Sequence, residues 1–171
     1  GEGFTVTTER GDWLADALVV ATGGKSIPKM GATSFGYRVA DQFGLRQTDT
    51  RPALVPFAFA EQELPAIAPL AGVSLPARVT AGKAGFDEAL LFTHRGLSGP
   101  AILQASSYWR EGEAVTIDLA PGHDVGEVLR AARAQGGKQG TKAVLAGLLP
   151  ERLAGDLVTR QGLAGPLATQ S

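Results

Sequence analysis

Residues 17–24 decide how this chain folds, and they read Ala17-Leu18-Val19-Val20-Ala21-Thr22-Gly23-Gly24. An apolar, β-branched run without alternation is typical of a strand buried on both faces of a parallel or mixed sheet. Two glycines follow the run, and because glycine has no Cβ the backbone can turn tightly there and approach another group closely. Ligands of open α/β sheets bind at the carboxyl ends of strands, so this turn predicts contact with a nucleotide-type cofactor. A buried strand followed by an ordinary glycine loop is the alternative.

The composition is that of a globular chain without a marked charge. Of the 171 residues, 44% are hydrophobic and 19% are charged, which favours a folded domain over disorder. The 16 basic and 17 acidic residues show no basic block, so we expect a small-molecule substrate and no nucleic acid. The absence of cysteine excludes disulfides and thiolate chemistry. No run has the length of a membrane span and no signal peptide is visible, so we expect no membrane partner and a cytoplasmic location.

The first 50 residues predict a hairpin, the strand at 17–24 and one helix. Residues 4–8 alternate between apolar and polar side chains, as in a half-buried strand, and residues 13–16 can pair back on them. Apolar residues at helical spacing then predict a helix capped by Thr33 or Ser34 and ended by Gly44 in a left-handed conformation. These apolar residues are Phe35, Val39, Ala40 and Phe43.

A change of composition at Arg51-Pro52 predicts a domain boundary, followed by a β-rich domain. The predicted strands are short and are joined by Gly- and Pro-containing connections, which favours an antiparallel sheet or a small barrel. Pro56 interrupts the first of them and indicates an edge strand or a bulge. The predicted strands cover residues 53–60, 75–80, 89–92 and 113–119.

Residues 123–171 predict a helical part. Asp124 and Glu127 have the spacing of a capping box, and the helix that they open ends at a Gln-Gly-Gly sequence. Two further helices are predicted over residues 141–149 and 150–162. Because helices of this length are marginal in isolation, we expect them to pack on each other or on other parts of the protein.

A second informative stretch runs from Leu91 to Leu103 and reads LFTHRGLSGPAIL. A strand ends there, a glycine-containing turn follows, and the Ser-Gly-Pro at 98–100 matches the start of a helix. The free N–H groups of such a start would attract an anion, and His94 and Arg95 would add to the site. The alternative is a well-capped helix beside a solvent-facing His and Arg. A general acid or base role for His94 has no orienting partner nearby in sequence, so no catalytic side chain is identified. No metal-ligand spacing is present either.

Together the two stretches resemble the BaiN/RdsA (YhiN-like) family of bacterial FAD-dependent oxidoreductases. The Thr-His-Arg-Gly-Leu-Ser-Gly-Pro run is specific to that family, whereas the Ala-Thr-Gly-Gly turn is shared with the wider glutathione-reductase-like flavoproteins. The resemblance covers about residues 4–162. The residues that carry it are Ala21 to Thr33, Phe35-Gly36-Tyr37, Pro52 to Pro56 and Leu91 to Leu103.

The resemblance implies an α+β fold. Residues 1–50 would form the end of the first half of a Rossmann-type FAD-binding domain, residues 51–122 an inserted antiparallel β-barrel-like domain, and residues 123–171 a truncated helical part of the insertion. The family's amino-terminal Gly-x-Gly-x-x-Gly fingerprint and its carboxyl-terminal flavin segment are absent. We therefore expect an internal fragment that is inactive by itself and binds FAD weakly or not at all.

The resemblance also implies a function and a set of contacts. The parent protein would pass a hydride from NAD(P)H through FAD to an organic acceptor, and the cofactor-binding residues, acting mainly through the backbone, would be Ala21, Thr22, Gly23 and Gly24. The substrate-pocket candidates, which rest on helix-start chemistry, are Thr93, His94, Arg95, Gly96, Ser98, Gly99 and Pro100. The alternative is a non-catalytic inserted lid or partner-binding module without cofactor contact of its own. Self-association of the fragment through the apolar strand is a further expectation.

Overall fold

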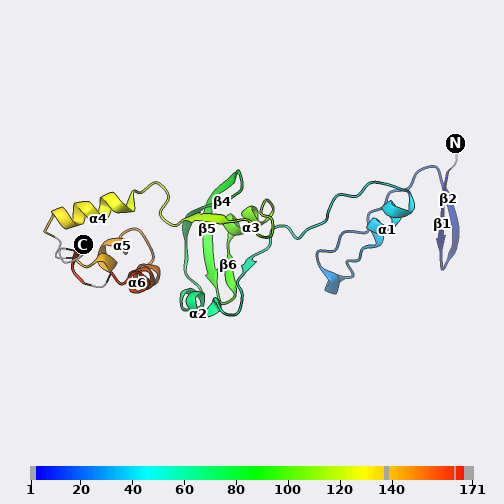
Figure 1. Cartoon of the computed structure of the whole chain (residues 1–171). Helices are drawn as coiled ribbons and strands as arrows, with labels where there is room; N and C mark the ends of the chain where they lie inside the picture. The colour runs from blue at the N-terminus through cyan, green and yellow to red at the C-terminus, as the bar shows by residue number, and fades with distance from the viewer. Residues whose placement is uncertain (1–2, 137–138, 164, 168–171) are drawn as a thin grey trace. The chain divides into compact units, whose positions relative to one another are not determined.

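The computed structural model of the chain describes residues 3–136, 139–163 and 165–167 (Figure 1). The chain divides into two compact units, Gly1–Arg51 (unit 1) and Pro52–Ser171 (unit 2). No helix within the described residues is long and apolar enough to cross a bilayer.

Unit 1 contains a β-hairpin and one α-helix. Strands β1 (Phe4–Thr8) and β2 (Gly11–Ala15) pair antiparallel, as the alternating sequence predicts. A short 3₁₀ helix, η1, covers Pro28–Met30, and helix α1 covers Phe35–Gln42. The predicted end of α1 is confirmed, because Gly44 has a φ of 64° and the Leu45 N–H donates to the Ala40 carbonyl at 2.9 Å.

Residues 17–24 do not form the predicted buried strand. They pair with no strand among the described residues, and the Val19 side chain is 85% exposed. A strand in the middle of a sheet needs neighbours on both sides to satisfy its N–H and C=O groups. The described part of unit 1 supplies only the two strands of the hairpin, which bond to each other. The apolar pattern of residues 17–24 was therefore not enough to make a strand without its neighbours.

Unit 2 is built on a five-stranded antiparallel sheet with the strand order β3-β6-β5-β4-β7 (Figure 1). The antiparallel prediction is confirmed, but the bounds of all four predicted strands differ, two of them by more than two residues. The apolar run at 53–60 yields only a two-residue edge strand after Pro56, and the strand predicted at 89–92 begins earlier, at Ala84. The strands are β3 (Phe57–Ala58), β4 (Ser74–Ala81), β5 (Ala84–Thr93), β6 (Gly96–Ser98) and β7 (Val115–Asp118).

One short helix covers the buried face of this sheet. Helix α3 (Pro100–Ser106) packs on β4 and β5 and buries small and branched side chains against them. The alternation of β4 decides which face is covered, because every second side chain of this strand is buried. The residues that meet here are Leu75, Ala77, Val79, Ala81, Leu90, Ala101, Ile102 and Ala105.

Between β3 and β4 the chain is more regular than its prolines suggest. Helix α2 (Leu64–Ile67) and a 3₁₀ helix, η2 (Ala68–Leu70), lie in this segment. Each carries a proline in its first turn, where no N–H is needed for helical bonding.

Three helices follow the sheet: α4 (Val125–Ala134), α5 (Thr141–Leu145) and α6 (Glu151–Arg160). The predicted cap of α4 is confirmed, since the Asp124 carboxylate accepts the Glu127 N–H at 2.9 Å. Helix α5 ends four residues earlier than predicted, and backbone hydrogen bonds typical of turns follow it up to Leu149. Gly137, predicted to help end α4, lies outside the described residues.

The three helices share the core of unit 2. Leu153, Ala154 and Val158 of α6 are buried in the same cluster as the sheet residues. Two arginines of α6 also reach the α2–η2 segment: Arg152 donates to the Pro69 and Ala71 carbonyls, and Arg160 donates to the Ala66 carbonyl. Helical part and sheet are thus joined by apolar contacts and by bonds to backbone oxygens.

Candidate functional site

The glycine turn of unit 1, Gly23-Gly24, exposes its backbone because neither residue has a side chain. Gly23 has a φ of 70°, and no atom lies within 4 Å of the place where a Cβ would be. A Cβ on Gly24 would lie 3.6 Å from the Tyr37 Oη. The turn borders an open hollow of about 460 Å³ lined by Val20, Thr22, Gly23, Gly24, Gly36 and Tyr37.

Helix α1 reaches this turn because of another glycine. A Cβ on Gly36 would lie 3.2 Å from the Thr22 Oγ1 and 3.8 Å from the Val20 Cγ1, so a larger residue would push the helix away. The arrangement fits a backbone contact with a phosphate or ribose of a dinucleotide, which is the contact predicted for Ala21 to Gly24. The six residues that line the hollow include the Thr22 hydroxyl and the Tyr37 phenol but no carboxylate, imidazole or amine side chain.

Cations lie beside the turn. The Lys25 Nζ sits 5.1 Å from the ring centroid of Tyr37, and the Arg38 guanidinium carbon sits 5.7 Å from that of Phe35. The sequence between Asp16 and Asp41 contains Lys25, Lys29 and Arg38 but no acidic residue. These three cations are too widely spaced to form a basic block in the sequence, so a search for such a block does not find them.

The second predicted stretch forms the β5–β6 hairpin of unit 2, and His94 and Arg95 are its two turn residues. The Thr93 hydroxyl donates to the Gly96 carbonyl at 3.1 Å and accepts the Arg95 N–H at 3.2 Å. These bonds fix the turn backbone, while both turn side chains are exposed. The Arg95 carbonyl also accepts the Phe59 N–H at 3.0 Å, which ties the turn to the residue after β3.

Gly96 and Gly99 are explained by close backbone packing. A Cβ on Gly96, whose φ is 145°, would lie 2.1 Å from the Phe57 carbonyl oxygen. A Cβ on Gly99, whose φ is 93°, would lie 2.6 Å from the Ala89 carbonyl oxygen. Only glycine therefore lets β6 and the start of α3 lie this close to β3 and β5. Between them, Ser98 is half-buried, and Pro100 is exposed at the start of α3.

The structure thus brings Thr93 to Pro100 together along one hairpin and the helix start that follows. These residues do not line the cavity of unit 2 described next. The anion site predicted at the start of α3 stays a prediction.

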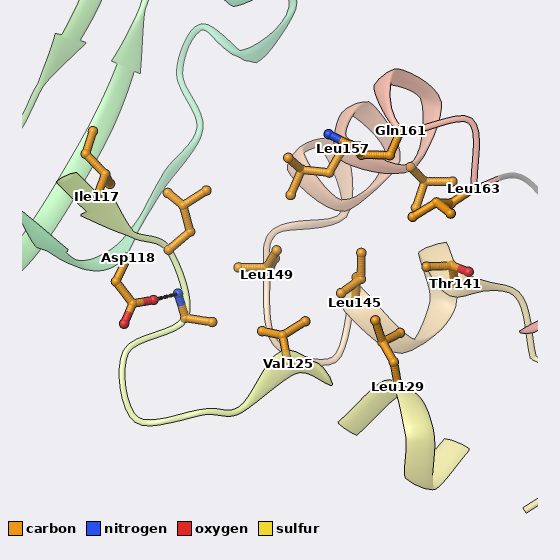
Figure 2. Close-up of a pocket in the computed structure, with 13 residues that line it drawn as sticks. Ile117, Asp118, Val125, Leu129, Thr141, Leu145, Leu149, Leu157, Gln161 and Leu163 are labelled. Carbon is orange, nitrogen blue, oxygen red and sulfur yellow. Dashed lines mark hydrogen bonds between the residues drawn. The ribbon is translucent and has the colours of Figure 1, made fainter. Parts of the chain in front are cut away.

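An apolar cavity of about 340 Å³, which the sequence did not predict, lies between the end of β7 and the three helices. Figure 2 shows side chains from β7, α4, α5 and α6 around it. Its only carboxylate is engaged, because Asp118 Oδ1 accepts the Ala120 N–H at 2.9 Å. The lining is therefore mainly apolar, with Asp118 as the one carboxylate among the residues that line the cavity. The labelled lining residues are Ile117, Asp118, Val125, Leu129, Thr141, Leu145, Leu149, Leu157, Gln161 and Leu163.

The fold defines a class of protein: an antiparallel sheet covered by a short helix and followed by a group of short helices. The family described as the HI0933-like protein barrel and H2TH domain matches residues 51–171, and the chain belongs to this family. The antiparallel sheet agrees with the barrel in that description, and the family resemblance seen in the two sequence stretches is confirmed.

Two relatives match most of the chain. The ribosomal RNA dihydrouridine synthase of Haemophilus influenzae is 44% identical over 162 residues, which cover 94% of this chain and 40% of that protein. The ribosomal RNA dihydrouridine synthase of Escherichia coli is 47% identical over 152 residues, which cover 88% of this chain and 38% of that protein. The chain spans about two fifths of the length of these relatives.

These names overturn one expectation. From the sequence we expected a small-molecule substrate and no nucleic acid, whereas both relatives are named for an activity on ribosomal RNA. The expectation was wrong because balanced charge and the lack of a basic block do not exclude an RNA partner. Contact with RNA depends on where cations gather, not on their total.

Proposed function

We propose that this chain is part of a longer flavoprotein that reduces uridine in ribosomal RNA to dihydrouridine. The observation that carries the proposal is its 44–47% identity to two ribosomal RNA dihydrouridine synthases over 88–94% of its length. Both predicted stretches, the glycine turn and the β5–β6 hairpin, fall within the aligned length.

Unit 1 is proposed as part of a Rossmann-type FAD-binding domain. Among its described residues, 3–51, none is buried. The hairpin, residues 18–22 and α1 instead surround a hollow of about 620 Å³ lined largely by apolar side chains, including those of Phe4, Leu18, Phe35 and Phe43. We infer that other strands of the longer protein fill this hollow and give residues 17–24 the neighbours they lack. Residues 51–122 and 123–171 are the inserted barrel and its helical part.

The cofactor proposed for this domain is FAD, contacted through the backbone of Ala21 to Gly24. A reduced nicotinamide, the proposed electron source, would first reduce the bound FAD. The reduced flavin would then supply the hydride that, with a proton, adds across the C5=C6 double bond of uracil and leaves the flavin oxidised. The positive φ of Gly23 keeps its backbone accessible, and Gly36 lets α1 hold Thr22 in place. In unit 2, the exposed side chains of the β5–β6 turn are the proposed substrate contacts, since Thr93 fixes their backbone.

The activity is tested with the full-length protein, a uridine-containing ribosomal RNA transcript and reduced nicotinamide. Digestion and mass spectrometry should show nucleosides that have gained two hydrogens. A protein that binds no flavin and leaves every uridine unreduced would instead be explained by the alternative, a non-catalytic lid or partner-binding module. The self-contained core of unit 2 is the observation that favours this alternative.

The cofactor contact is tested by Gly24→Ala. A methyl group there would meet only the Tyr37 Oη at 3.6 Å, an ordinary contact, so folding should be unchanged. If the Gly24 backbone touches FAD, the methyl group displaces it, and we expect flavin absorbance per protein to fall about tenfold at limiting flavin. Ser26→Ala is the matched control. Full flavin occupancy in Gly24→Ala, or a drop in the melting temperature that accounts for the loss, would remove Gly24 from the cofactor site.

A further inference from the structure

The loop and helix beside the glycine turn form a cationic surface that the proposed cofactor contact does not use. We call it the basic loop–helix face, and it consists of Lys25, Lys29 and Tyr37. The loop backbone is compact: the Met30 N–H donates to the Ile27 carbonyl at 2.9 Å, and the Gly31 N–H donates to the Pro28 carbonyl at 3.0 Å. Lys29 therefore projects from a fixed turn, and Lys25 is held over the Tyr37 ring.

The two lysines have no acidic partner in the part of the chain that the structure describes. Within the described residues, no carboxylate oxygen lies within 4 Å of either ammonium group. Other cations of the chain do pair, since Arg51, Arg78, Lys142 and Arg160 each form an ion pair at 2.6–2.9 Å. Exposed cations gathered in a segment without acidic residues favour a polyanion as the partner.

Apolar side chains accompany the lysines. Met30 is 81% exposed and Ile27 is 52% exposed, and both lie in the same turn as Lys29. A phosphodiester backbone would pair with the ammonium groups, and exposed apolar atoms suit the faces of unstacked bases, which a duplex does not offer.

We propose that the basic loop–helix face binds the phosphodiester backbone of a single-stranded segment of the RNA substrate. The inference rests on the proposed function, which requires a uracil to come close to the flavin. Lys25 follows the glycine turn directly in sequence, and its partner Tyr37 lines the hollow at that turn. A strand held on these lysines passes beside the place proposed for the cofactor.

The test uses the full-length protein with its flavin and a fluorescently labelled oligo(U) single strand. The variant Lys25→Gln/Lys29→Gln removes two charges, and Arg10→Gln/Arg46→Gln removes two exposed charges elsewhere in unit 1 as the matched control. Each phosphate contact contributes about −0.7 to the slope of log affinity against log salt for single strands. Losing two should reduce the slope by about 1.4 and weaken binding roughly fifteenfold at 0.15 M salt.

We expect the control and Lys25→Arg/Lys29→Arg to bind like the wild type, with equal flavin absorbance in every variant. Equal salt slopes for wild type and Lys25→Gln/Lys29→Gln would overturn the inference. Loss of flavin together with RNA affinity would overturn it as well, because the lysines would then serve the cofactor diphosphate. If the wild type reduces uridine but Lys25→Gln/Lys29→Gln binds oligo(U) as tightly as the wild type, the inference is wrong and the proposed function stands. If the wild type binds oligo(U) through the two lysines but reduces no uridine, the proposed function is wrong and the inference about binding stands.

Discussion

Replacing Gly96 by alanine tests whether the glycines of the β5–β6 stretch serve packing. The new methyl carbon would lie 2.1 Å from the Phe57 carbonyl oxygen, so β3 must move by about an ångström to restore a normal contact. A φ of 145° adds strain, because only glycine adopts it readily.

The expected cost adds three effects. Backbone strain costs about 1–3 kcal/mol. Moving β3 weakens its pairing with β6 and the Phe59–Arg95 backbone bond, and each hydrogen bond is worth about 1 kcal/mol. The Phe57 ring, edge-on to Trp109 at 5.3 Å, loses part of a contact worth about 0.5–1.5 kcal/mol. We therefore expect Gly96→Ala to lower the free energy of unfolding of unit 2 by about 3–5 kcal/mol.

Gly82→Ala is the matched control. Gly82 lies in the β4–β5 connection of the same sheet, has a φ of 58°, and has no atom within 4 Å of a Cβ position. Gly82→Ala should lower the free energy of unfolding by only about 1 kcal/mol, because alanine is disfavoured in the left-handed conformation. Urea unfolding followed by tryptophan fluorescence reports on unit 2, because Trp109 is half-buried while Trp13 is 62% exposed. If the free energies of unfolding of the two variants differ by less than about 0.5 kcal/mol, the clash with the Phe57 carbonyl does not govern stability. Gly96 would then be explained better by contact with a ligand.

Two further predictions concern α6. Arg152→Met keeps much of the side-chain length but removes the hydrogen bonds to the Pro69 and Ala71 carbonyls. In urea unfolding, the free energy of unfolding should fall by about 1–2 kcal/mol. Lys142→Met, which removes an exposed ion pair, is the control and should have a smaller effect. The hydrogen bond from Lys142, and then its charge, lower the pKa of Glu151 in the folded chain. The stability that this pair contributes is therefore present above the pKa of Glu151 in the unfolded chain and is lost as the pH falls through its pKa in the folded chain. The difference in free energy of unfolding between wild type and Glu151→Gln should vanish in acid. A difference that stays constant with pH would argue against this linkage.

Elements with a local chemical signal were predictable from the sequence. The turn between β1 and β2, the Gly44 end of α1 and the Asp124 cap of α4 each depend on a few neighbouring residues. Whether residues 17–24 form a strand could not be predicted in the same way, because a strand in a sheet depends on partners that lie far away in the chain. The same reason explains why the short edge strand β3 was overestimated: its length is set by β6, which has only three residues.

The candidate site was predictable as a set of residues but not as a set of roles. The sequence singled out Gly96 and Gly99 as substrate-pocket candidates, and the structure adds a packing explanation through the carbonyls of Phe57 and Ala89. No spacing rule reveals such contacts, since both partners belong to other strands. The cations beside the glycine turn were overlooked because Lys25, Lys29 and Arg38 are spaced too widely in the sequence to form a basic block.

The distribution of buried residues gives the two units different dependence on the rest of the protein. The described buried residues all lie in unit 2, whereas unit 1 leaves its apolar side chains at open hollows. Because burial of apolar surface is the main favourable term in folding, unit 2 has its own source of stability and unit 1 has little. The proposed cofactor turn and the proposed RNA-binding lysines both belong to unit 1. We therefore expect flavin binding and RNA binding to depend on the same strands, those proposed to come from the rest of the longer protein and to fill the hollow beside residues 17–24.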